Sequence, residues 1–240
     1  RGLHFGQQPN QDIVSFVKGR NRLTIKASQR PGVRQIKVSM ADGTCIRATI
    51  DESTHYLPMS VCTRTGFHGW TYTQKSNARV CQGEVQWQGR QYDLESLRAL
   101  AGVDWTGGYM RHETSWNWAS ISGRLHDQRK IGLNLSAGVN ETGFSENTLW
   151  IDGVPTVMPA VHFQFDRTKQ QSGWSVTSHD NRVRLHFDPV VNYHDHTNAI
   201  IAASNFRQHL GRFNGEIDLP HETIHIEDIW GLAEDHYARW

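Results

Sequence analysis

Cysteine is scarce in this chain: there are three in 240 residues, and none belongs to a C-x-x-C pair. An odd number at irregular spacing supports neither a disulfide framework nor a thiolate zinc site. We therefore expect Cys45, Cys62 and Cys81 to be free, buried thiols in a reducing compartment such as the cytoplasm. One disulfide among the three is the alternative if the protein is exported.

Long hydrophobic runs are also missing, since no apolar stretch approaches the roughly 20 residues that span a bilayer. We therefore expect no integral membrane segment. The chain begins at Arg1, without Met and without an apolar signal segment, so we expect that its native N-terminus is missing or processed.

Runs of like charge are absent, although the two parts of the chain differ in sign. Residues 1–90 hold 13 basic and 5 acidic residues, whereas residues 91–240 hold 12 basic and 19 acidic ones. The basic residues are scattered through strand-like segments, which argues against nucleic-acid binding. Attraction between two oppositely charged lobes is the simpler interpretation.

The motifs of several enzyme classes are missing too, because the chain has no GxSxG nucleophile, P-loop or dinucleotide fingerprint. This argues against hydrolases, kinases and dehydrogenases, and we expect no cofactor. His194 and His196 would share one face of a strand, but no compact third ligand accompanies them. We therefore expect no metal.

A period of two dominates what the sequence does contain. Apolar and polar residues alternate in four clear segments, at 35–40, 130–135, 161–166 and 182–187. Such alternation is typical of strands with one face in a core. Glycine and Asx turns follow or separate these segments, at 41–43, 126–128, 152–153 and 179–181. The pattern predicts an all-β fold, an antiparallel barrel or sandwich.

One short helix is predicted over Asp93–Ala101 (DLESLRALA), where Asp93 would cap the first turn and Gly102 would end the last. Because this helix separates two groups of strands, we expect two β-lobes. The N-terminal lobe would span residues 1–92, and the C-terminal lobe residues 93–240.

The segment from Asp104 to Asp152 combines large aromatic rings with paired charges. Apolar walls with a few placed polar groups are typical of a ligand cavity. A structural ion pair, for instance between Asp104 and Arg111, is the alternative. The candidate ligand-binding residues are Tyr109, Arg111, Trp116, Trp118, Glu146 and Trp150.

The candidates for catalysis are Asp104, Glu141 and His236. Burial beside aromatic rings would raise the pKa of Asp104 and let it act as an acid near neutral pH. Glu141 would form an acid–base pair with Glu146, unless both belong only to a polar hairpin. Neighbouring carboxylates would raise the pKa of His236, unless its segment serves only to dock the last strand.

We expect one cavity to collect Asp104, Arg111, Trp116, Trp118, Glu141 and Glu146. Trp116 and Trp118 lie two residues apart and would share one strand face. If the strand from Ser115 pairs with the strand from Lys130 through the turn at 126–128, Asp104 and the 140–147 loop lie at the same end of that hairpin. The two tryptophans would then form the floor of a barrel.

Several long blocks resemble the family called "domain of unknown function 2804". These blocks are DWTGGY, WNWAS, GLNLSAGVNETGFSENTLWIDG, FRQHLGRFNGEI and WGLAEDHYARW. The resemblance covers residues 69–240 well and the first sixty residues poorly. That family is distantly similar to lipocalin-like carotenoid hydratases of the hydroxyneurosporene synthase type. The resemblance implies a lipocalin-like β-barrel that binds a hydrophobic substrate, and it carries over no catalytic residue.

The function we expect is binding of a hydrophobic or amphipathic small molecule, with cofactor-free hydratase, lyase or isomerase chemistry if the protein is an enzyme. A lipid carrier without chemistry and a structural or interaction module are the alternatives. An enzyme would show perturbed carboxylates inside a pocket, and a carrier would show an apolar pocket with one polar anchor. An interaction module would show an exposed apolar patch and no pocket.

Overall fold

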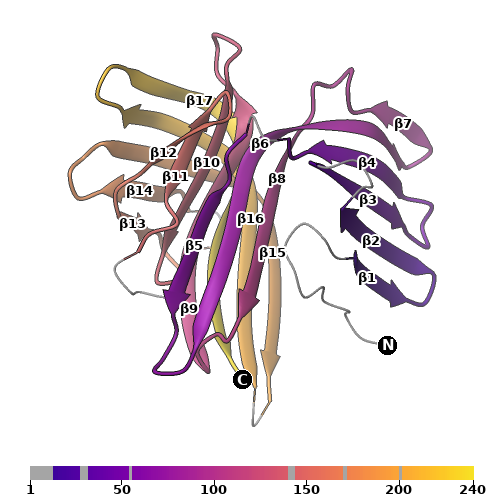
Figure 1. Ribbon diagram of the computed structural model, residues 1–240, viewed down its shortest axis with the longest axis horizontal. Coiled ribbons are helices and arrows are strands. Elements are labelled where there is room, and N and C mark those ends of the chain that lie inside the picture. The colour runs from indigo at the N-terminus through magenta and orange to yellow at the C-terminus, as the bar shows by residue number, and fades with distance from the viewer. Residues whose placement is uncertain (1–12, 28–31, 54–55, 140–143, 170–171, 200–201) are drawn as a thin grey trace.

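The structure is a computed structural model that describes residues 13–27, 32–53, 56–139, 144–169, 172–199 and 202–240. The regular secondary structure of these residues consists of β-strands, and the paired strands run antiparallel. They form two curled sheets, one from each part of the chain (Figure 1). The expected all-β, lipocalin-like architecture with two lobes is thereby confirmed. No helix in the described residues could cross a membrane.

The first sheet has eight strands, in the order β1-β2-β3-β4-β6-β5, with β7 and β8 also paired to β6. Their bounds are β1 (Ile13–Lys18), β2 (Asn21–Ala27), β3 (Val33–Ser39), β4 (Cys45–Asp51), β5 (Met59–Arg64), β6 (Trp70–Trp87), β7 (Arg90–Asp93) and β8 (Leu100–Gly108). The core of this sheet is small, because among the described residues its hydrophobic cluster has Ala48, Ile50 and Cys81 as buried members.

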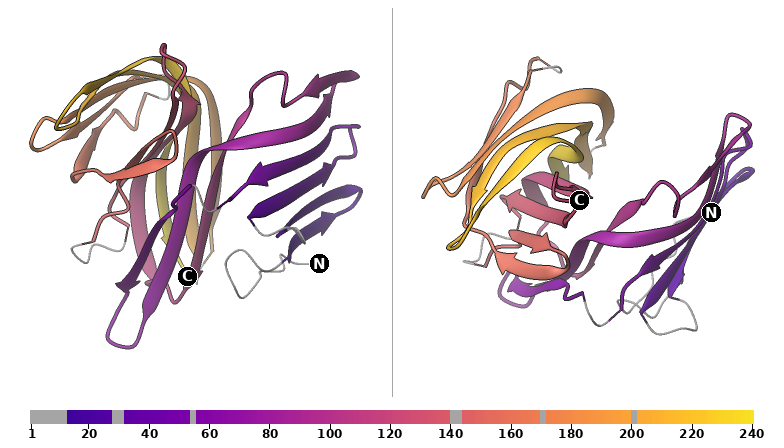
Figure 2. Two further views of the ribbon diagram at one scale, coloured as in Figure 1. Left: turned by 45° about the horizontal axis from the view of Figure 1, so that its top comes forward. Right: turned by 90° about the horizontal axis from the view of Figure 1, so that it is seen from above.

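The second sheet has nine strands, in the order β12-β11-β10-β9-β17-β16-β15-β14-β13. Their bounds are β9 (Glu113–Arg124), β10 (Lys130–Ala137), β11 (Thr148–Ile151), β12 (Val154–Val157), β13 (Val161–Gln164), β14 (Trp174–Ser178), β15 (Val183–Asn198), β16 (Ala203–Asp218) and β17 (Thr223–Arg239). Seen from above, this sheet curls into a half-barrel (Figure 2). A large core cluster that includes Trp174, Phe187 and Phe213 fills one face of this sheet.

Strand β6 belongs to two layers (Figure 1). Its first part, up to Ser76, pairs with β5 and β8, and we call these three segments the ribbon. Its last part, from Cys81, pairs with β4 and β7. A register shift between Ser76 and Arg79 separates the two parts, and Ala78 has a φ of 58° there. The amide of Ala78 donates to Ser122 Oγ at 3.0 Å, which ties this bend to β9.

The bend of β6 also lies directly against β10. A Cβ atom added at Gly132 would lie 2.8 Å from the carbonyl oxygen of Asn77. The Asn77 side chain then donates from Nδ2 to Ser120 Oγ at 2.8 Å. The absence of a side chain at Gly132 therefore lets the ribbon lie flat on the outer face of the second sheet, which is where the candidate site forms.

The four alternating segments lie on strands β3, β10, β13 and β15, as predicted. The hairpin of β9 and β10 is also confirmed, with Arg124 opposite Lys130. The predicted helix over Asp93–Ala101 is wrong. Asp93 caps only a turn, in which its Oδ1 accepts from the amide of Ser96 at 2.6 Å. Arg98 then takes a left-handed φ of 51°, so the chain leaves the turn and enters β8.

The division of the chain into lobes between residues 92 and 93 stays a prediction. In the structure the chain leaves the first sheet after Gly108 and enters the second at Glu113. Strand β8, which follows the predicted boundary, pairs with β6 of the first sheet.

Candidate functional site

Two adjoining pockets lie between the ribbon and the outer face of the second sheet. Their volumes are about 270 Å³ and 220 Å³, and both are lined by Lys75, Asp104 and Trp118. The first continues along apolar side chains of β8, β16 and β17, which are Val103, Leu210, Trp230 and Leu232. The second continues towards the far end of the ribbon, along Met110, Trp116 and Val139. We call the two pockets together the inter-sheet cavity.

Lys75 is the centre of the inter-sheet cavity. Its Nζ lies 3.2 Å from Asp104 Oδ2 and 2.9 Å from Glu146 Oε2. The side chains of Lys75 and Glu146 are 10% and 8% exposed, whereas that of Asp104 is 48% exposed, so the cavity opens to solvent beside Asp104. Burial disfavours the ammonium, but the two carboxylates outweigh burial and raise the pKa of Lys75.

The register of β6 and β8 explains this cluster. Lys75 pairs directly with Asp104, and Thr73 pairs with Thr106, so one face of the ribbon presents polar groups to the cavity. Glu146 comes from the segment before β11 and reaches the same point. A strand face of this kind is buried only because the second sheet covers it.

Trp118 forms the wall opposite Lys75, whose Nζ lies 5.4 Å from the indole centroid. The indole Nε1 donates to Asn134 Oδ1 at 2.7 Å, and Asn134 Nδ2 donates to the carbonyl oxygen of Glu146 at 2.9 Å. Asn134 therefore orients both the aromatic wall and the segment that carries the Glu146 carboxylate. The cation lies near a ring face and between two anions, an arrangement that holds it in one position.

Glu234 is the fourth titratable group of the cavity, after Lys75, Asp104 and Glu146. It lies opposite Trp118 in the β9–β17 pair, and its carboxylate accepts from Gln208 Nε2 at 2.6 Å and from Trp116 Nε1 at 3.4 Å. Burial raises the pKa of Glu234, and these hydrogen bonds offset the effect only in part. Glu234 is thus a carboxyl group of the cavity that is suited to hold a proton.

His236 lies beside the cavity and does not line it. Its ring centroid is 4.3 Å from that of Trp116, and its Nε2 is 3.1 Å from Ser204 Oγ. The expectation that carboxylates raise the pKa of His236 is wrong, because burial lowers it and outweighs the nearby Asp235. A neutral imidazole behind Trp116 can position that ring without contacting a ligand.

Four of the predicted site residues meet in the inter-sheet cavity, namely Asp104, Trp116, Trp118 and Glu146. Glu141 lies outside the described residues. Tyr109 is 67% exposed on the turn after β8, and Arg111 follows it there, also exposed. Asp104 does form an ion pair, as the alternative interpretation expected, but its partner is Lys75 and the example given there was Arg111.

Trp150 is fully buried at a different point, where its Nε1 donates to the carbonyl oxygen of Leu57 at 2.8 Å. The tryptophan floor of a barrel, predicted above, is wrong. Ala119 and Ile121 belong to the core cluster on one face of β9, whereas Trp116 and Trp118 lie on the opposite face. The core cluster fills the concave face, so the cavity lies outside the half-barrel.

Lys75 and Glu234 are the site residues that the sequence did not single out for this role. The available signal for Lys75 was a strand segment, residues 71–77 (TYTQKSN), with polar side chains on nearly every position. That pattern marks a polar face, and a polar face is normally exposed. Its partners Asp104 and Glu146 lie far away along the chain, so only the pairing of the strands reveals the cluster.

The chemistry available to this site is proton transfer in an apolar-walled cavity. A carboxyl with a raised pKa can donate a proton near neutral pH, and a carboxylate nearby can accept one. A fixed ammonium such as that of Lys75 stabilises negative charge that develops on a substrate. In the described ranges, the cavity included, no group of three or more His, Cys, Asp or Glu is placed to hold a metal ion.

Comparison with known families gives a match over residues 1–240 to the model described as "Domain of unknown function (DUF2804)". The chain belongs to this family. The resemblance found in the sequence blocks is thereby confirmed, and it extends over the whole DUF2804 chain. Among curated proteins, no match to this DUF2804 chain was found.

Three solved structures are similar to the DUF2804 chain. The crystal structure of CghA with Sch210972 has a TM-score of 0.51 at 8% identity, covering 96% of this chain and 72% of that one. A second crystal structure of CghA has a TM-score of 0.49 at 10% identity, with the same shares covered. The kievitone hydratase of Nectria haematococca has a TM-score of 0.47 at 9% identity, covering 95% and 82%. At this identity, the first likeness shows that the fold is shared.

Proposed function

We propose that this protein binds a small, largely apolar molecule with one neutral polar group in the inter-sheet cavity, and that it transfers protons to or from that molecule. The reaction class is a hydration, elimination or isomerisation that needs no cofactor. The observation that carries the proposal is the buried Lys75 ammonium between Asp104 and Glu146, in a cavity walled by indole rings and facing Glu234.

The shape of the cavity supports an elongated ligand. Each pocket is slightly smaller than the 300–1,000 Å³ or so of a usual ligand pocket, but the two adjoin at three shared residues. The apolar part of the ligand would lie along Leu210, Trp230 and Leu232. Its polar group would lie at Lys75.

The charge of the cavity restricts the polar group. Asp104 and Glu146 together outweigh the one ammonium of Lys75, so an anionic ligand is disfavoured. A hydroxyl or carbonyl group can accept from Lys75 Nζ without adding negative charge. In this arrangement Glu234 supplies the proton and Asp104, which is open to solvent, accepts one from water or from the ligand.

One further observation supports the proposal, because a chain of the same fold has been crystallised with Sch210972. We also propose a reducing compartment such as the cytoplasm, because Cys45, Cys62 and Cys81 are free thiols. The expected burial of all three is wrong, since Cys81 is buried and Cys62 is exposed.

The test separates binding from chemistry. Titration with geraniol, and with decanol as a saturated probe, is expected to change the tryptophan emission of the wild-type protein. Lys75→Met should weaken the response to both alcohols, and decanoate should bind less well than decanol. Deuterium incorporation from D₂O into a panel of unsaturated alcohols and ketones, measured by mass spectrometry, then reports proton transfer.

Glu234→Gln should abolish deuterium incorporation and leave binding intact. Glu227→Gln, on the same strand but bound to the exposed His126, is the matched control and should keep wild-type incorporation. Binding without incorporation in the wild-type protein would favour the carrier function. No binding of any neutral probe would refute both.

A further inference from the structure

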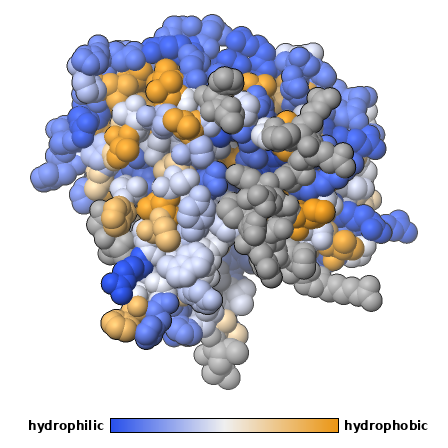
Figure 3. Space-filling model, viewed as in Figure 1, coloured by the Kyte–Doolittle hydropathy of each residue, from blue (hydrophilic) through white to orange (hydrophobic). Residues whose placement is uncertain are grey.

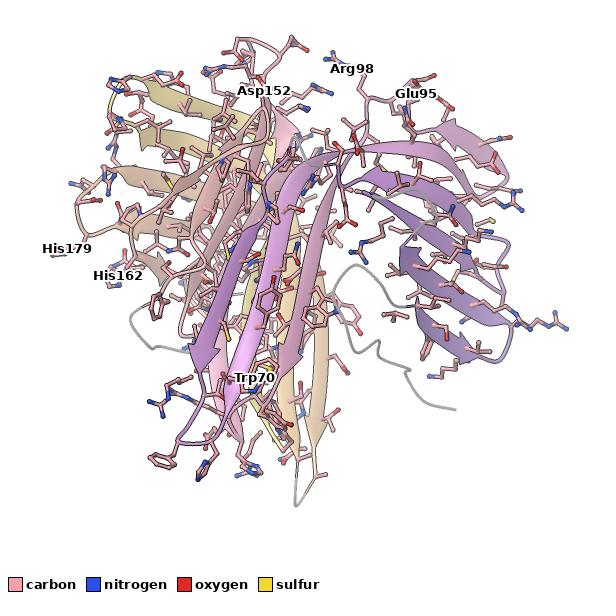
Figure 4. All side chains as sticks on the ribbon, viewed as in Figure 1. Trp70, Glu95, Arg98, Asp152, His162 and His179 are labelled. Atoms are coloured by element: carbon pink, nitrogen blue, oxygen red, sulfur yellow. The ribbon has the colours of Figure 1, made fainter. Side chains whose placement is uncertain are left out.

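An aromatic tip is formed where the β5–β6 turn meets the turn after β8. It consists of residues 64–72 and 107–112. Phe67, Trp70 and Tyr109 are 82%, 47% and 67% exposed there, and the rings of Trp70 and Tyr109 lie 6.0 Å apart. Figure 4 shows Trp70 at the lower end of the ribbon, far from Glu95 and Arg98 at the upper end.

The tip is a fixed part of the fold. The amide of Tyr109 donates to the carbonyl oxygen of Trp70 at 2.7 Å, and Thr65 Oγ1 donates to the carbonyl oxygen of Tyr109. Gly108 has a φ of 134°, and a Cβ atom there would lie 2.3 Å from the carbonyl oxygen of Trp70. The two turns are therefore locked together, and the exposure of the rings follows from the backbone.

The charge of the tip has one sign. Its two segments contain Arg64, Arg111 and two histidines, and they contain no carboxylate. Glu113, the next residue, is engaged by a hydrogen bond from the Tyr237 hydroxyl of β17 at 2.9 Å. Both arginines are exposed. In the space-filling view the upper rim is mainly hydrophilic, whereas pale and orange surface is interspersed with blue at the lower end (Figure 3).

This composition fits the surface of a lipid bilayer. Indole and phenol rings prefer the headgroup region, where one side of the ring is apolar and the other is wet. Arginine next to such rings is attracted to anionic headgroups. A protruding turn with three exposed rings can enter a soft interface, whereas a specific protein partner would need a larger matched surface.

The tip is also continuous with the inter-sheet cavity. Met110 follows Tyr109 directly and lines the second pocket. Thr73 and Thr106, which pair across the ribbon, line the same pocket a few residues from the tip. A ligand that dissolves in lipid would therefore meet the cavity within a short distance of the bilayer.

We propose that the aromatic tip docks this protein on the surface of an anionic lipid bilayer, with Phe67, Trp70 and Tyr109 in the headgroup region and Arg64 and Arg111 against the headgroups. This goes beyond the proposed function, because the tip can bind to a bilayer whether or not the cavity binds a ligand.

The experiment is co-sedimentation with vesicles of phosphatidylcholine and phosphatidylserine, compared with vesicles of phosphatidylcholine alone. The wild-type protein should bind the anionic vesicles and bind the neutral ones less. The double variant Phe67→Ser/Trp70→Ser should lower the partition coefficient by about tenfold or more on both vesicles. Arg64→Gln/Arg111→Gln should lower it by about tenfold on anionic vesicles only, and added salt should do the same.

Trp87→Ser is the matched control, because Trp87 is 49% exposed at the opposite end of the same strand. It should change the partition coefficient by less than about twofold. Lys75→Met, which alters the cavity, should also leave vesicle binding unchanged. The proposal is overturned if the wild-type protein binds neither vesicle, or if Trp87→Ser weakens binding as much as the tip variant. It is equally overturned if Phe67→Ser/Trp70→Ser changes only self-association in size-exclusion chromatography.

Discussion

At the scale of single residues, the polar centre of the cavity depends on the charge of Lys75. Lys75→Met leaves the Glu146 carboxylate, whose side chain is 8% exposed, without its cation. Breaking a buried pair in this way is expected to lower the free energy of unfolding by about 3 kcal/mol. Adding Glu146→Gln to Lys75→Met should restore most of that loss. Urea unfolding of the two single variants and the double variant measures the coupling.

The control for that cycle is the exposed pair of Arg47 and Glu84, whose side chains are 68% and 39% exposed. Arg47→Met should leave the free energy of unfolding nearly unchanged, because solvent screens such a pair. If Lys75→Met is as harmless as Arg47→Met, the cluster is not the buried charge centre described above.

Glu234 gives a prediction about pH. The pKa of Glu234 is raised above the ordinary value of 4.5 in the folded protein, so binding of a proton at Glu234 favours the folded state. This contribution to the free energy of unfolding is fully present below pH 4.5. That contribution is lost as the pH rises through the folded-state pKa. Glu234→Gln, which is neutral at every pH, should therefore be more stable than the wild-type protein at pH 7. The difference should shrink towards zero below pH 4.5.

Thermal or urea unfolding from about pH 4 to about pH 8 measures this difference in stability between Glu234→Gln and the wild-type protein. Glu227→Gln, with an exposed carboxylate, should show no such trend. A Glu234→Gln variant that is less stable than wild type at pH 7 would mean that the carboxylate is stabilised in the folded protein. Greater stability together with lost activity is the pattern expected of a strained functional group.

At the scale of the elements, the bend in β6 decides where Lys75 points. Ala78 is fully buried and has a left-handed φ of 58°. Ala78→Gly relieves that backbone conformation but removes a buried methyl group, so the two effects nearly cancel and the change should stay within about 1 kcal/mol. Ala78→Val places a β-branched side chain in the same conformation and should cost about 2–3 kcal/mol.

Ala119 provides the matched control for Ala78, since it is equally buried on β9 with no left-handed φ. Ala119→Gly should cost more than Ala78→Gly, because it loses the methyl group and gains backbone freedom without relieving any strain. Equal costs at both positions in urea unfolding would mean that the bend of β6 stores no strain.

The elements also show what the sequence can and cannot predict. Local periodicity was sufficient for strands β3, β10, β13 and β15, because residues such as Leu133 and Leu185 alternate with polar neighbours. The helix prediction failed at Arg98, since pairing of β8 with β6 outweighs the local propensity of a short segment. Asp104, Trp116, Trp118 and Glu146 were predicted to share a cavity because the two tryptophans lie on one strand of a hairpin, and Asp104 and the 140–147 loop lie at its open end. Lys75 was missed because only the pairing of β6 with β8 brings it next to Asp104.

At the scale of the whole molecule, the second sheet provides a rigid wall for the site, and the first sheet covers that wall. The second sheet has twenty buried residues in one hydrophobic cluster, and that cluster fills its concave face. A filled half-barrel cannot hold a ligand inside, but its outer face is rigid. The ribbon of the first sheet lies on that face and closes the cavity, so the site exists only while the two sheets remain in contact.

The unequal cores predict unequal stability along the chain. The hydrophobic cluster of the first sheet has three buried members, and no residue of the edge strand β1 is buried. Hydrogen exchange should therefore be fastest in β1 and β2 and slowest in β9, β10 and β17, which pair around the large core. Strand β6 should be divided, with residues 71–77 protected by the second sheet and residues 82–87 exchanging early. Peptide-resolved exchange measured by mass spectrometry tests this gradient, and a uniform rate along β6 would show instead that the two sheets open as one cooperative unit.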